Sequence, residues 1–107
     1  MGAPTLYVVD VIKNILSYMS KLIPKSKVRV NELGRGEIFY KPVIGEERKL
    51  VEIYGTSERR RESVGNHRIV VDFKDPSLKE DPKLMEFLYK QKKEISEQKE
   101  PIELVIK

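Results

Sequence analysis

The sequence predicts a single α+β domain, 1–107, with an N-terminal helix, a four-stranded antiparallel meander, a second helix and a short C-terminal strand. Three observations lead to this class. Two segments have apolar residues at helical spacing, others alternate apolar and polar residues as strands do, and short connections join most of the strands. A chain of 107 residues has room for one core. We therefore expect one sheet with helices packed on one face.

The first helix is predicted over residues 5–23, although 5–9 alone would also fit a short strand. Its apolar residues recur at intervals of three and four: Val8, Ile12, Ile15, Met19 and Leu22. Pro24 ends the helix. Further apolar residues widen this surface to more than half of the circumference, so the helix needs two neighbours. Either its own domain surrounds it, or a second copy packs on it to form a homodimer.

The strands of the meander follow. Four segments are predicted: 27–33, 37–44, 49–54 and 67–73. Gly34 and Gly36 supply the first reversal. Pro42 cannot donate a hydrogen bond to a sheet, so the second strand ends there or lies at an edge.

The second helix is predicted to begin at Asp81 and Pro82, an acidic cap followed by proline at the first turn. Leu84, Leu88 and Ile95 form its apolar stripe, and lysine and glutamate fill its solvated face. Residues 101–107 are predicted as the last strand.

The composition narrows the class of protein. The absence of cysteine excludes disulfides, zinc–thiolate sites, iron–sulfur clusters and thiol nucleophiles. Charged residues make up 36% of the chain, with Lys and Glu in excess and few amides, as in proteins of thermophilic archaea and their viruses. No apolar run is long enough for a membrane span and no leader is visible, so we expect a cytoplasmic protein. The net charge of +4 favours a polyanionic partner.

The segment SERRRESVGNH, 57–67, is longer than a hairpin requires and carries three consecutive arginines. Adjacent guanidinium groups repel one another unless an anion neutralises them, and they match phosphate oxygens bidentately. We therefore predict an arginine-rich hairpin loop that binds DNA or RNA, supported by a basic first hairpin and by Tyr40 and Tyr54 as base-stacking candidates. The predicted binding residues are Arg59, Arg60, Arg61, Arg68, Lys27, Arg29, Arg35 and Lys49. No cofactor is expected.

Two alternatives remain open. In the first, the same loop docks on an acidic protein, and the chain is a regulatory interaction module. In the second, IVVDFK (69–74) resembles the strand motif of PD-(D/E)xK nucleases, which implies metal binding by Asp72 and phosphate contact by Lys74. Glu52 or Glu58 would then supply the second acid. The single histidine, His67, is interpreted as a strand-start or loop residue.

Overall fold

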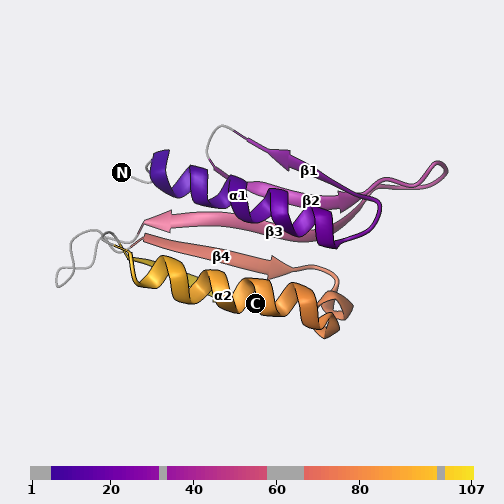
Figure 1. Ribbon diagram of the computed structural model, residues 1–107. Coiled ribbons are helices and arrows are strands. Elements are labelled where there is room, and N and C mark those ends of the chain that lie inside the picture. Colours follow the sequence, from indigo (N-terminus) through magenta and orange to yellow (C-terminus); the bar gives the residue numbers. More distant parts are fainter. Residues whose placement is uncertain (1–5, 32–33, 58–66, 99–100) are drawn as a thin grey trace.

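The computed structural model describes residues 6–31, 34–57, 67–98 and 101–107 (Figure 1). In chain order, the elements are α1 (Leu6–Leu22), β1 (Ser26–Val30), β2 (Gly36–Tyr40), β3 (Arg48–Ser57), β4 (His67–Phe73), the 3-10 helix η1 (Pro76–Glu80), α2 (Pro82–Ser96) and β5 (Ile102–Ile106). This order confirms the predicted α+β class.

The five strands form one sheet in the order β1-β2-β3-β4-β5. The first four are antiparallel neighbours, which confirms the meander. The strand β5 lies parallel to β4, because α2 carries the chain back along the sheet before β5 begins. The sequence predicted this last strand but not its position in the sheet. Both β1 and β5 are edge strands.

Several strand boundaries differ from the prediction. The strand β2 ends at Tyr40 rather than at 44, because Pro42 has no N–H group to continue the ladder. The strand β3 continues past Tyr54 to Ser57, where it pairs with His67 of β4. The connection between β3 and β4 is therefore shorter than the sequence indicated. Its residues 58–66 lie outside the described part of the chain.

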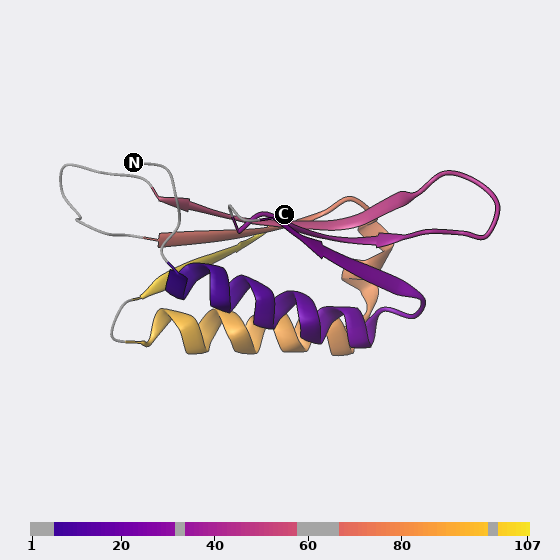
Figure 2. The same ribbon diagram turned by 90° about the horizontal axis from the view of Figure 1, so that it is seen from above.

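Both helices cover the same face of the sheet (Figure 2). The helix α1 packs against β1, β2 and β3, and α2 packs against β5. The core between these layers is built from fully buried aliphatic side chains: Ile12, Ile15, Leu16, Met19, Ile38, Val51, Ile53, Ile69, Leu84, Leu88 and Leu104. The residues Val8, Ile12, Ile15, Leu16 and Met19 of α1 are thus buried within its own domain, whereas Tyr18 remains 51% exposed. The homodimer considered for this helix stays a prediction.

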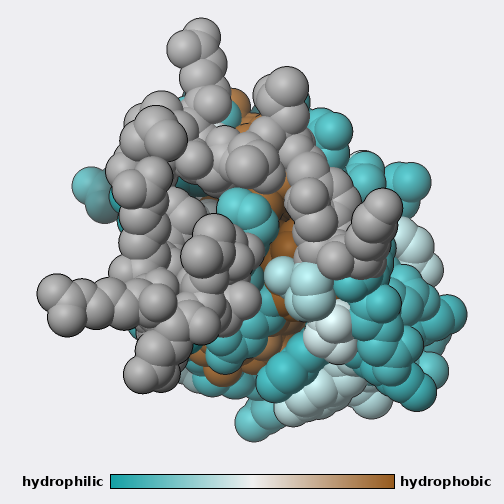
Figure 3. Space-filling model, turned by 90° about the vertical axis from the view of Figure 1, so that its left-hand side faces the viewer, coloured by the Kyte–Doolittle hydropathy of each residue, from teal (hydrophilic) through white to brown (hydrophobic). Residues whose placement is uncertain are grey.

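The contact between α1 and β2 depends on Gly36. A Cβ atom added at this position would overlap Cδ1 of Leu16, so only glycine lets the helix approach the strand this closely. At the end of the sheet where β3 ends and β4 begins, apolar surface is visible as a band between hydrophilic residues (Figure 3). Among the described residues, no helix covers the other face of the sheet, which we call the open face (Figure 2).

Candidate nucleic-acid interface

A row of charged residues crosses the open face of the sheet. The strand registers place Arg29 opposite Glu37, Glu37 opposite Glu52, and Glu52 opposite Asp72. Residues that stand opposite one another in a sheet point to the same side. Three neighbouring strands therefore bring three carboxylates into one line, and the basic side chains beside them neutralise these carboxylates.

The centre of this face is an ion-pair network, which we define as Arg29, Arg35 and Lys49 with Glu37, Glu47 and Glu52. Arg29 donates to Glu37 and to Glu47, each at 2.7 Å. Arg35 lies 3.0 Å from Glu52, and Lys49 lies 3.1 Å from Glu37 and 3.5 Å from Glu52. Three cations thus meet three carboxylates, and the network adds no net charge.

Ion pairing in the network raises the pKa of two of its cations. The hydrogen bond to Glu37 raises the pKa of Lys49, and the hydrogen bond to Glu47 raises the pKa of Arg29. The Glu37 and Glu52 side chains are only 17% and 14% exposed, so their carboxylates depend on these partners in place of water. Arginine and lysine held in this way are less available to an external phosphate.

Aromatic rings on the open face are covered by the same cations. The Arg29 guanidinium lies 4.3 Å from the ring centre of Phe39, and that of Arg35 lies 5.0 Å from the ring centre of Tyr54. Tyr40 lies on the other side of the sheet, where it packs against the core. Of the two tyrosines considered as stacking platforms, Tyr40 therefore faces the helices, and a base would have to displace Arg35 to reach Tyr54.

The other predicted binding residues fall into three groups. Arg68 donates to Glu103 from Nε and Nη2, each at 3.3 Å. Arg59, Arg60 and Arg61 lie outside the described residues. Lys27, at the start of β1, forms no ion pair within the part of the chain that the structure describes. Four of the predicted residues thus pair with the protein's own carboxylates: Arg29, Arg35, Lys49 and Arg68. Lys27 forms no such pair among the described residues.

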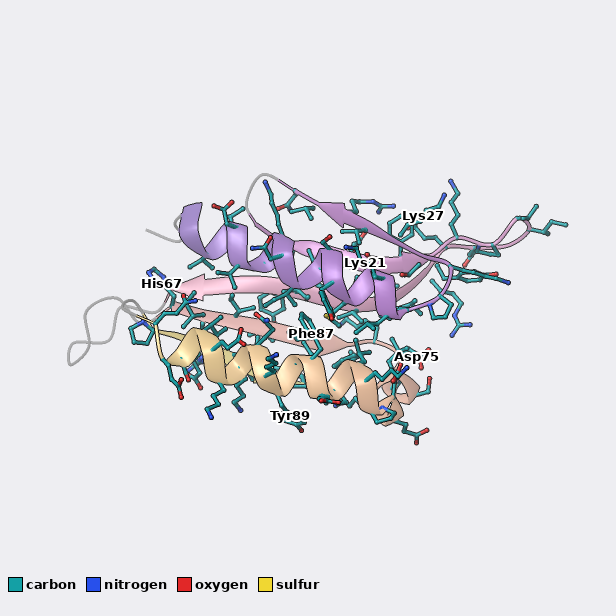
Figure 4. All side chains as sticks on the ribbon, viewed as in Figure 1. Lys21, Lys27, His67, Asp75, Phe87 and Tyr89 are labelled. Carbon is teal, nitrogen blue, oxygen red and sulfur yellow. The ribbon has the colours of Figure 1, made fainter. Side chains whose placement is uncertain are left out.

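Lys27 belongs to a lysine cluster, which we define as Lys25, Lys27 and Lys41. Ser26 stands opposite Tyr40 and Lys27 opposite Phe39, so Lys25 and Lys41 flank the same end of the β1–β2 pair. All three side chains are exposed. None forms an ion pair among the described residues. Lys27 points outward at the end of the molecule from which the β2–β3 hairpin projects (Figure 4).

The β2–β3 hairpin itself was not predicted as a site. Its connection, 41–47, extends beyond the neighbouring elements in both ribbon views (Figures 1 and 2). Val43 and Ile44 at its tip have relative exposures of 104% and 90%. A signal was present in the sequence, since two branched aliphatic residues stand between Pro42 and Gly45 in a turn. We interpreted this segment as the end of a strand.

The motif that resembles PD-(D/E)xK nucleases also lies on the open face. Lys74 Nζ donates to Asp72 Oδ2 at 2.9 Å, and this hydrogen bond lowers the pKa of Asp72. Glu52, one of the two residues considered for the second acid, stands directly across from Asp72. Its carboxylate, however, binds Arg35 and Lys49. Among the described residues there is no group of three histidine or acidic side chains that could hold a metal ion.

Comparison with known proteins yielded no relationship: no family model, curated protein or solved structure matches this chain. Within the described ranges, neither helix has the length and apolar character needed to cross a membrane.

Proposed function

We propose that the protein binds nucleic acid through its phosphate backbone, and that the lysine cluster makes the main contacts. One observation carries this proposal: three exposed lysines gather at one end of the β1–β2 pair without carboxylate partners among the described residues. On the open face beside them, each cation of the network is paired. Unpaired cations that lie close together repel one another and attract a polyanion.

The arginine loop extends the same proposal. Arg59, Arg60 and Arg61 follow directly after the end of β3, whereas the lysine cluster lies beside the start of that strand. Because these arginines lie outside the described residues, their part in binding is measured separately from that of the lysine cluster.

The experiment is a titration of a labelled DNA duplex, followed by fluorescence anisotropy between about 50 and about 200 mM salt, where phosphate contacts are strongly weakened. The wild-type protein is compared with the lysine-cluster variant Lys25→Gln/Lys27→Gln/Lys41→Gln. Each lost phosphate contact is expected to reduce the slope of log affinity against log salt by about 0.9. The variant should therefore show a shallower slope and weaker binding.

A matched control removes the same charge elsewhere. Lys90→Gln/Lys92→Gln/Lys93→Gln changes three exposed lysines of α2, far from the β1–β2 pair in the sequence. Equal losses in the two variants would show that only net charge matters and would refute the cluster as a site. Arg59→Gln/Arg60→Gln/Arg61→Gln measures the loop separately. If the wild-type protein binds no duplex at low salt, the acidic-protein alternative takes precedence.

A further inference from the structure

The tip of the β2–β3 hairpin, Pro42 to Gly45, exposes two adjacent branched aliphatic side chains. Val43 and Ile44 are close to fully exposed and contact no core residue. A single exposed aliphatic residue is common on protein surfaces. Two together at the end of a projecting hairpin place apolar surface where a ligand can reach it from several sides. Val43 and Ile44 therefore add no apolar contacts to the core of the domain.

The hairpin is held at its base and shaped at its tip. Glu47 accepts a hydrogen bond from Arg29 at 2.7 Å, and Arg48 lies 3.8 Å from Asp75. These contacts attach the chain at the start of β3 to β1 on one side and to Asp75, the cap of η1, on the other. Gly45 has a φ of 118°, a backbone conformation that favours glycine. On the side of the hairpin that follows β2, the ring of Pro42 restricts the backbone angle φ. The tip therefore projects in a defined direction.

The spacing between the tip and the lysine cluster suits a groove of duplex DNA. Ile44 lies three residues beyond Lys41, which limits its reach to about 10 Å at most, at about 3.3 Å per fully extended residue, because the chain bends at residues 43–45. The minor groove of B-DNA is about 7.5 Å deep. Lysines that hold the phosphates at the groove edge would therefore allow the tip to reach the bases.

We infer that, in the complex with nucleic acid proposed above, Val43 and Ile44 form an apolar wedge that enters the minor groove of duplex DNA and opens a base step. This inference rests on the proposed function and adds its substrate class, a deformable DNA duplex. Proteins that insert aliphatic side chains in this way unstack the step and kink the duplex toward the major groove. Double-stranded RNA fits less well, because its minor groove is wide and shallow.

One charge at the tip opposes this arrangement. Glu46 is exposed and, among the described residues, forms no ion pair. Its carboxylate would approach the phosphates as the tip enters the groove. Glu46→Gln is therefore expected to increase affinity for duplex DNA, which separates a tip inside the groove from a tip that points away from the DNA.

The experiment measures binding and deformation on the same duplex. It carries a fluorescent adenine analogue, whose emission rises when its step is unstacked, and a donor and acceptor dye at the two ends, whose energy transfer rises on bending. The variant is Val43→Ser/Ile44→Ser, which changes side chains outside the core and should leave the fold intact. Tyr89→Ser, at an exposed aromatic residue of α2, is the control.

The expected result is that the wild-type protein and Tyr89→Ser unstack and bend the duplex, while Val43→Ser/Ile44→Ser binds with the same salt slope but produces neither signal. Salt-dependent binding without unstacking by the wild-type protein would overturn the wedge and leave the proposed function standing. Bending by the tip variant equal to that of the wild type would also overturn it. Absence of any salt-dependent binding would refute the proposed function, and the wedge with it.

Discussion

The centre of the open face and the end of the sheet from which the β2–β3 hairpin projects both contain basic residues, but they hold them differently. On the open face, Arg29 has two carboxylates at 2.7 Å, and its neighbours in the network are paired as well. At the hairpin end, Lys25, Lys27 and Lys41 have no ion pair within the described chain. The same residue types therefore stabilise the sheet in one region and remain available to an external anion in the other.

The first prediction compares two isoleucines on either side of Lys41. Ile38→Ala removes a fully buried side chain from the core and should lower the free energy of unfolding by about 2–5 kcal/mol. Ile44→Ala removes an exposed side chain at the tip and should change it by less than about 0.5 kcal/mol. Urea unfolding followed by circular dichroism measures both. A substantial loss in Ile44→Ala would mean that the tip serves the fold.

The second prediction concerns the approach of α1 to the sheet. Gly36→Ala places a Cβ atom against Leu16 and should destabilise the protein by about 1–3 kcal/mol, as overpacking of a core does. The paired change Gly36→Ala/Leu16→Ala gives the overlap room, so it should cost less than the sum of the two single changes. Additive losses in this double-mutant cycle, measured by urea unfolding, would contradict the contact.

The third prediction changes the charge balance of the network. Glu52→Gln removes the carboxylate that binds Arg35 at 3.0 Å and Lys49 at 3.5 Å. We expect a loss of stability of about 1 kcal/mol or less, typical of ion pairs near the surface, together with stronger binding to DNA. The second effect arises because two cations lose a partner. Glu86→Gln on α2 changes the net charge equally, and a gain as large in that variant would argue against release of these cations.

The fourth prediction concerns acid pH. Hydrogen bonds from Ser77 lower the pKa of Asp75, which caps η1. A carboxylate whose pKa is lower in the folded than in the unfolded state adds stability above its unfolded value, about 4 for aspartate, and loses it as the pH falls through the folded value. The difference in melting temperature between wild type and Asp75→Asn should therefore be present at neutral pH and shrink below pH about 4.

Asp10→Asn, at an exposed carboxylate of α1, serves as the control for this titration. A difference between wild type and Asp75→Asn that stays constant from neutral to acid pH would show that the cap contributes without its charge. A difference that grows toward acid pH would have the wrong sign for a lowered pKa.

The fold was largely predictable because its signals are local. Helical spacing located both helices, Asp81 and Pro82 marked the start of α2, and β4 begins at the predicted His67. The position of β5 beside β4 was not predictable in the same way, because its pairing depends on the path of the chain through α2. The segment assigned to β2, 37–44, was too long, but the alternative in which Pro42 ends the strand is confirmed, since β2 ends at Tyr40.

The candidate site was less predictable, since charge pairing joins residues that are distant in sequence. Arg29 meets Glu47, 18 residues away, and Arg68 meets Glu103, 35 residues away. In the sequence, Arg29 and Lys27 belong to the same basic hairpin. In the structure, Arg29 forms ion pairs with Glu37 and Glu47, whereas Lys27 forms none among the described residues. The register between β1 and β2 separates them, because it places Arg29 opposite Glu37 and Lys27 opposite Phe39.

The most direct test of this distinction compares the salt dependence of DNA binding for two double variants. Lys25→Gln/Lys27→Gln removes two lysines of the cluster and should reduce the slope of log affinity against log salt by about 1.8, two contacts at about 0.9 each. Arg29→Gln/Glu47→Gln removes a cation of the network together with a carboxylate that pairs with no other cation among the described residues, so the slope should stay unchanged. A slope that falls in this network variant, or one that is retained in the cluster variant, would contradict the distinction.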